Sequence, residues 1–127
     1  MRLIFVLDCV DADVLADFWS AALGFGRTAF SGQYVRLTDP AGRWPDLLLQ
    51  QVPEPRLGKN RMHLDIHAID AAAEVARLTA LGASVIDPAH DDEGYLTTIL
   101  ADPQGNEFCV LRPPEGSSDH RKLVASD

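Results

Sequence analysis

Hydrophobic and polar residues follow first the pattern of a strand and then that of a helix, and this succession occurs twice along the chain. The stretch IFVLDCVDADVLADFWSAALG (4–24) opens with an apolar-rich run, continues after Asp11 with apolar residues at helical spacing, and ends in Leu-Gly. The stretch HLDIHAIDAAAEVARLTALG (63–82) repeats this order, with Asp70 in the place of Asp11. Because Asp is a good helix N-cap and Gly a good helix terminator, each stretch predicts a strand followed by a helix.

Four landmarks recur at a nearly constant offset. Asp11 and Asp70 are 59 positions apart, Gly24 and Gly82 are 58 apart, and the turn sequences DPAG and DPQG begin 63 apart. We interpret this as two copies of one module, each with a strand, a helix and three further strands. The later strands are expected at 27–30, 33–38 and 47–52 in the first copy, and at 84–87, 95–101 and 107–112 in the second.

The 127 residues suffice for one compact domain. We predict a single domain over 1–112, with module one at 1–52, a linker at 53–60 and module two at 61–112. The segment VPEPRLGKN around the linker contains two prolines and a glycine, which suit a connection between modules. The polar C-terminal tail, 113–127, is expected to be loose, with room for one helical turn.

Composition narrows the classes of partner. The formal charge of −8, with no basic cluster, argues against nucleic acid. No apolar run reaches membrane-spanning length, and Asp8 and Asp11 interrupt the apolar start, so we expect neither a membrane segment nor a signal peptide. The two cysteines, Cys9 and Cys109, are too few for a disulfide scaffold, which favours reduced thiols and a cytoplasmic location.

Three stretches carry a resemblance to a known family: LDCVDADVLADFWSAALGF (7–25), LLLQQVPEPRLGKNRMHLDI (47–66) and DPQGNEFCVL (102–111). Here the chain resembles the vicinal oxygen chelate superfamily of glyoxalases, bleomycin-resistance proteins and extradiol dioxygenases, in particular its small bacterial glyoxalase-like branch. The resemblance implies an α+β fold of two βαβββ modules in tandem. Their eight strands would form a cupped mixed sheet around a ligand or metal, and two copies would pair as a homodimer.

The resemblance also implies a metal site, because metal-binding members take ligands from the first and fourth strands of each module. In the second module these positions are His63 and Glu107, which suit one divalent cation such as Zn, Fe, Mn or Ni. In the first module Ile4 stands at the position of His63 and cannot ligate a metal. The counterpart of Glu107 is either Asp46, a possible third ligand, or Leu48. A protein without any cofactor is an equal alternative.

Strand alternation predicts which neighbours share the face of His63. If His63 faces the cup, Asp65 and His67 face it too, while Leu64 and Ile66 pack under the helix. The Cα atoms of His63 and His67 would lie about 13 Å apart, too far to share a metal, whereas His63 and Asp65 can share one.

The predicted ligand pocket therefore includes Asp65, His67, Cys109 and Trp44. Asp65, His67 and Trp44 each have an alternative interpretation. Asp65 can instead bond backbone or an Arg, His67 lies near the rim, and Trp44 either closes the pocket or sits on the surface. Cys9, of opposite parity to Ile4, is expected to lie buried under a helix.

In the first helix we expect Phe18 in the core, and Trp19 is a candidate for a contact between two copies. The sequence shows no Ser-His-Asp set and no evident His partner for Cys109, which argues against nucleophilic catalysis. It also shows no Gly-rich phosphate loop, which argues against phosphate chemistry.

Three functions remain open for a glyoxalase-like small-molecule-binding protein. The first is a metal-assisted lyase, isomerase or dioxygenase reaction on a small oxygenated substrate. The second is a non-catalytic protein of the bleomycin-resistance kind that sequesters its ligand. The third is a metal-free enzyme with His63 or His67 as general base. Whether the protein is an enzyme stays undecided at this level.

Overall fold

A computed structural model describes residues 1–126, without the side chain of Phe30. The chain divides into two compact units, with the boundary between Gly58 and Lys59. This boundary lies inside the predicted linker; that the two modules form one domain remains a prediction. None of the described helices is long and apolar enough to span a membrane.

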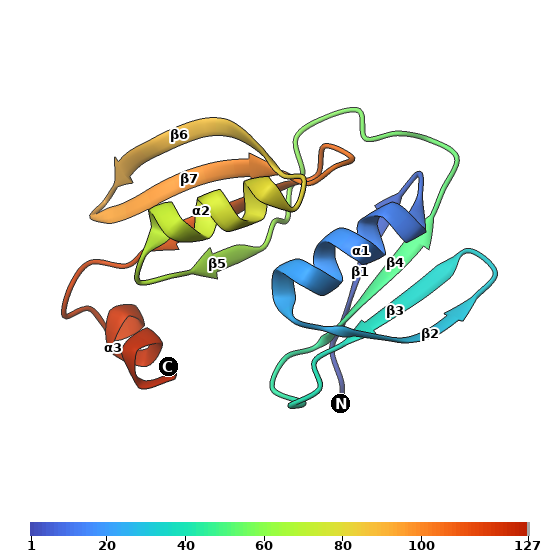
Figure 1. The fold of residues 1–127 in the computed structure, drawn as a ribbon, viewed down its shortest axis with the longest axis horizontal. Coiled ribbons are helices and arrows are strands. Elements are labelled where there is room, and N and C mark those ends of the chain that lie inside the picture. Colours follow the sequence, from blue (N-terminus) through green and yellow to red (C-terminus); the bar gives the residue numbers. More distant parts are fainter. Residues whose placement is uncertain (127) are drawn as a thin grey trace. The chain divides into compact units, whose positions relative to one another are not determined.

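The first unit contains one four-stranded sheet and one helix, α1 (Figure 1). The strand order is β1-β4-β3-β2, with β1 and β4 parallel and the other neighbours antiparallel. Helix α1 packs against β2, β3 and β4. The elements are β1 Ile4–Cys9, α1 Ala12–Leu23, β2 Gly26–Ser31, β3 Tyr34–Thr38 and β4 Asp46–Gln51.

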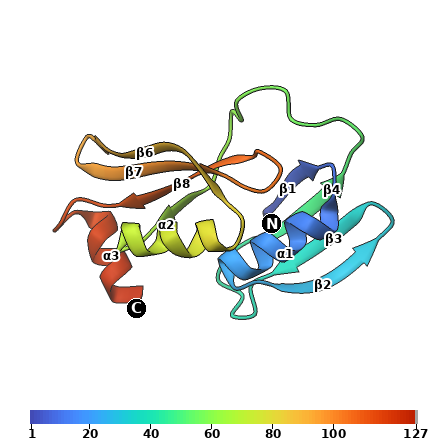
Figure 2. The ribbon, with the colours of Figure 1, turned by 45° about the horizontal axis from the view of Figure 1, so that its top comes forward.

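The second unit repeats this topology, with strand order β5-β8-β7-β6 and a parallel β5–β8 pair (Figure 2). Helix α2 packs against β8. The predicted α+β class, two-module plan and eight strands are confirmed, and the eight strands form two four-stranded sheets. The elements are β5 Asp65–His67, α2 Ala71–Ala80, β6 Ser84–Asp92, β7 Tyr95–Ala101, β8 Glu107–Arg112 and α3 Ser118–Ser126.

Each sheet buries one face under its helix, as strand alternation predicts. In the first unit Leu37 and Leu49 are fully buried, together with Leu15 of α1. In the second unit Val110 is fully buried, together with Leu78 of α2. We call the opposite face of each sheet its open face; it carries Leu48 in the first unit and Asp65 in the second.

The predicted helix caps are confirmed. The Asp11 side chain accepts hydrogen bonds from the backbone N–H groups of Asp13 and Val14, and Asp70 accepts one from Ala73. Gly24 ends α1 with a left-handed φ of 72°, the conformation that favours glycine at this position.

The repeated Asp-Pro-x-Gly sequences form turns held by buried carboxylates. Asp102 accepts from the N–H groups of Gln104 and Asn106 at 2.9 and 3.0 Å, and Asp39 accepts from Ala41 and Arg43, both at 3.0 Å. These turns lead into β8 and β4, so they fix where the fourth strand of each module begins.

Two expectations from the sequence are wrong. Trp19 is only 2% exposed and packs edge-on against Phe18, itself buried as predicted, so its indole is not available to a second copy. The C-terminal tail is more ordered than expected, because α3 extends over Ser118–Ser126. A tertiary contact stabilises it: the Tyr95 hydroxyl donates to Asp119 at 2.7 Å.

Candidate functional site

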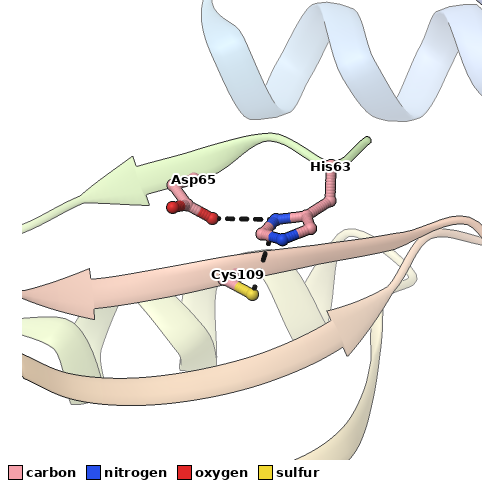
Figure 3. A group of neighbouring side chains, drawn as sticks. All are labelled: His63, Asp65 and Cys109. Carbon is pink, nitrogen blue, oxygen red and sulfur yellow. Dashed lines mark hydrogen bonds and ion pairs between the residues drawn. The ribbon is translucent and has the colours of Figure 1, made fainter. Parts of the chain in front are cut away.

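Three side chains of different chemistry converge on the open face of the second sheet (Figure 3). Asp65 opens β5 and is the register partner of Cys109 in β8. His63 lies two residues before Asp65, and the Cys109 N–H donates to the Leu64 carbonyl, which extends the parallel ladder toward it. Alternation along this ladder brings His63, Asp65 and Cys109 together.

One ring nitrogen of His63 faces both partners. His63 Nδ1 lies 3.0 Å from Asp65 Oδ1 and 3.9 Å from Cys109 Sγ. One ligand atom from each of the three residues lies within 4.8 Å of the other two. The His63 and Asp65 side chains are 41% and 43% exposed, whereas Cys109 is 8% exposed. The group therefore has a buried sulfur and a solvent-accessible imidazole and carboxylate.

The environment of Cys109 keeps its thiol protonated. Burial raises the pKa of Cys109 to about 11, and the neighbouring Asp65 carboxylate acts in the same direction. A Cys-His-Asp relay also needs the two imidazole nitrogens to face different partners, and here Nδ1 faces both. The sequence shows no evident His partner for Cys109, and the structure corrects this by placing His63 beside it, but the three residues are not arranged as a nucleophilic triad.

Glu107 begins β8 and shares the parity of Cys109, but it is not a member of the three-residue group. Its carboxylate is close enough to contribute to the raised pKa of the Cys109 thiol. Asp65 is paired with Cys109 in the parallel strands β5 and β8. Two residues earlier on both segments, the same register places His63 opposite Glu107. In the first sheet the same construction pairs Ile4 with Asp46. Asp46, and not Leu48, is thus the counterpart of Glu107.

Asp46 takes part in ion pairs in the first unit. Its buried carboxylate accepts from Arg36 at 2.7 Å and from Arg2 at 3.3 Å. Ile4, its register partner, has no ligand atom. Of the four metal positions that the resemblance implies, one is apolar and one is ion-paired, so the residues present do not fit a four-ligand site.

The open face of the first sheet has a hollow of about 250 Å³. It is lined by Ala29, Ser31, Tyr34, Arg36 and Leu48 from β2, β3 and β4. Sequence reasoning missed this site because no motif marks it. The available signal was alternation in the third strand, where Tyr34 and Arg36 must face away from the buried Val35 and Leu37.

The other two predicted pocket residues belong neither to the three-residue group nor to the lining of the hollow. His67 ends β5, and its ring centroid lies 6.2 Å from that of Tyr95. Trp44 lies in the loop between β3 and β4, is 62% exposed, and is not among the residues that line the hollow.

Comparisons with known proteins identify the family to which the chain belongs. A family described as "Glyoxalase-like domain" matches residues 4–111. The chain therefore belongs to the glyoxalase-like domain family, as its resemblance to the wider superfamily implied. A comparison with curated proteins gives no match.

Solved structures show the same fold at low sequence identity. A glyoxalase/bleomycin resistance protein/dioxygenase family enzyme from Burkholderia phytofirmans PsJN is 16% identical, with a TM-score of 0.71 and coverage of 86% of this chain and 95% of that chain. TnmS3, an antibiotic binding protein from Streptomyces sp. CB03234, is 22% identical, with a TM-score of 0.62 and coverage of 89% and 97%. These likenesses show the fold alone.

Proposed function

We propose that this protein binds and sequesters a small, largely apolar molecule that carries an anionic group. The observation that supports this function is the hollow on the open face of the first sheet, where Arg36 stands among Ala29, Tyr34 and Leu48. A concave, mostly apolar surface with a single charged group is the usual form of a small-molecule site.

The charge around the hollow favours an anion. Two guanidinium groups, from Arg2 and Arg36, meet the single carboxylate of Asp46, which leaves this cluster of three residues with one positive charge in excess. The exposed carboxylate of Asp8, on the same face of the sheet, offsets part of this charge. The whole chain carries a formal charge of −8, so this local excess is opposite to the bulk. The volume of about 250 Å³ lies just below the usual range of ligand pockets, which restricts the ligand to a small molecule. The antibiotic-binding structural neighbour supports a binding function on this fold.

Two matched dyes test the proposal. 1-Anilinonaphthalene-8-sulfonate has an apolar ring system with a sulfonate, and N-phenyl-1-naphthylamine has the same rings without it. We expect saturable fluorescence enhancement for both, with at least about tenfold tighter binding of the sulfonate at low salt. Ala29→Trp should fill the hollow and abolish binding, while Val14→Trp, on the exposed face of α1, should leave binding unchanged.

The proposal would be overturned by unaltered sulfonate binding in Ala29→Trp. Tighter binding of the neutral dye would remove the anionic group from the proposed ligand class. Circular dichroism of Ala29→Trp and Val14→Trp verifies that both variants are folded before their affinities are compared.

A second candidate function is a metal-assisted lyase, isomerase or dioxygenase reaction. The observation that favours it is the convergence of His63, Asp65 and Cys109 in the second unit. Turnover of the hemithioacetal of methylglyoxal and glutathione, or of catechol, would be assayed with added Zn²⁺, Mn²⁺, Ni²⁺ or Fe²⁺. Metal-dependent turnover that His63→Ala removes would replace sequestration with catalysis as the function.

We further infer a homodimer in the cytoplasm. The exposed Ile4 and Val6, at 38% and 50%, give β1 an apolar surface for a second copy. This surface adjoins the hollow, because Val6 is the register partner of Leu48. Neither Cys9 nor Cys109 is in a disulfide, which suits a reducing compartment. Light scattering at micromolar concentration should give twice the monomer mass, and a monomer mass alone would contradict the dimer.

A further inference from the structure

We propose that His63, Asp65 and Cys109 form a binding site for a thiophilic divalent cation of the Zn²⁺ and Co²⁺ class. This site differs from the ligand positions that the family resemblance implies, because it replaces Glu107 with Asp65 and Cys109. It lies in the second unit alone and does not depend on the proposed binding of an anion in the first.

The distances between the ligand atoms are close to those of tetrahedral coordination. Zinc bonds of about 2.0 Å to nitrogen or oxygen and about 2.3 Å to sulfur place neighbouring ligand atoms roughly 3.3–3.5 Å apart in a tetrahedral site with one sulfur. His63 Nδ1 is 3.0 Å from Asp65 Oδ1 and 3.9 Å from Cys109 Sγ, and each ligand atom is within 4.8 Å of the others. Shifts of less than about 1 Å would bring all three to one ion.

The backbone determines which part of the group can move. Asp65 and Cys109 are paired in the parallel ladder between β5 and β8, so their Cα positions are set by the sheet. The half-exposed His63 and Asp65 side chains have room to adjust around a more deeply buried sulfur. Binding therefore needs rotamer changes and no rearrangement of the strands.

The mixture of ligand atoms sets the class of cation. A sulfur ligand disfavours Mg²⁺ and Ca²⁺, which prefer oxygen, whereas sulfur, imidazole nitrogen and carboxylate oxygen together suit Zn²⁺ or Co²⁺. Metal binding breaks the Cys109 S–H bond, forms a metal–sulfur bond and releases one proton to solvent. Three protein ligands leave the fourth tetrahedral position to water.

Cobalt spectroscopy tests the site directly. The full chain, without a histidine tag and stripped of metal by chelator, is titrated with Co²⁺. We expect a near-ultraviolet thiolate-to-cobalt charge-transfer band that saturates at an equimolar ratio and disappears when Zn²⁺ is added. Cys109→Ser should abolish the band. His63→Ala and Asp65→Ala should weaken Co²⁺ binding at least about tenfold, since even losing a residue behind a metal ligand costs that much.

Two control variants make the result specific. Cys9→Ser removes the other thiol, which lies buried in β1 with its Sγ 3.5 Å from the Gln50 carbonyl, and should keep the band. Glu107→Gln changes the position that the family resemblance implies and should also keep it.

The proposal is overturned if the wild-type chain shows no charge-transfer band, or if the band survives Cys109→Ser and is lost in Cys9→Ser. Loss of cobalt binding in Glu107→Gln, with binding retained in Asp65→Ala, would show that the metal ligands are His63 and Glu107 instead. The Zn²⁺-induced rise in unfolding temperature, measured for each folded variant, provides a readout independent of the absorption band.

Discussion

Arg36 donates a 2.7 Å hydrogen bond to the buried carboxylate of Asp46 on the open face of the first sheet. Asp46 is the counterpart of Glu107 by strand register, so the two modules use equivalent carboxylates differently. In the first module the carboxylate holds the guanidinium of Arg36, which lines the hollow. In the second, Glu107 lies beside a separate group of His, Asp and Cys.

Arg36→Met should lower the free energy of unfolding by about 1–3 kcal/mol, because it leaves the buried Asp46 carboxylate with only the more distant Arg2. Urea unfolding at neutral pH measures the change. Arg27→Met is the control. Arg27 pairs with Asp13 and Asp17, whose side chains are 80% and 85% exposed, so its loss should cost no more than about 1 kcal/mol. Equal losses in the two variants would contradict the expected effect of burial.

Asp102→Ala should destabilise the second unit by about 2–4 kcal/mol. Its carboxylate is 2% exposed and accepts hydrogen bonds from the Gln104 N–H and from both the backbone and side chain of Asn106. Removing it leaves several buried donors unpaired. Thermal or urea unfolding measures the loss. Asp87→Ala, which removes a 56% exposed carboxylate, should change stability by less than about 0.5 kcal/mol.

Asp39 should make the protein less stable in acid. The N–H of Ala41 is the main group that holds the pKa of Asp39 below its ordinary value of 3.8, and the N–H and guanidinium of Arg43 assist. Because the folded pKa is lower than the unfolded one, this contribution is complete above about pH 4 and is lost as pH falls through the folded value. Urea unfolding from neutral to strongly acidic pH should show a shallower acid decline for Asp39→Asn than for the wild type.

Tyr95→Phe should release α3. The hydrogen bond to Asp119 attaches this helix to β7, so its loss should speed amide hydrogen exchange across Ser118–Ser126 several-fold. The same bond raises the pKa of Tyr95 above its ordinary value of 10.0, so the contact is complete below about pH 10 and is lost as pH rises through the folded value. Tyr34→Phe, on β3, should leave exchange in α3 unchanged. Unchanged exchange in Tyr95→Phe would show that other contacts hold the helix.

Gly24→Ala should cost about 1–2 kcal/mol, because φ at this helix terminus is 72° and a Cβ is strained there. A Cβ at Gly24 or at Gly26 would meet nothing within 4 Å, so only backbone conformation distinguishes the two positions. Gly26 has no left-handed φ, and Gly26→Ala should be neutral or slightly stabilising. Equal destabilisation of both variants by urea would contradict the conformational explanation.

The sequence by itself determined the local structure and the repeat. Asp11 and Asp70 were identifiable as caps because capping is a contact between residues two or three positions apart. The same locality made the Asp-Pro-x-Gly turns predictable. Strand alternation placed Asp65 and Cys109 on one face because the period of two is a property of the extended backbone.

Only the tertiary structure decided which side chains meet. The 2.7 Å bond from Arg36 to Asp46 joins neighbouring strands at a register that residue types alone do not specify. The burial of Trp19 and the attachment of α3 through Asp119 likewise depend on packing between distant segments. His63 could be placed near Asp65 from the sequence, but not with one nitrogen facing both Asp65 and Cys109. Such choices depend on rotamers and strand register, and these are fixed only when the whole sheet has formed.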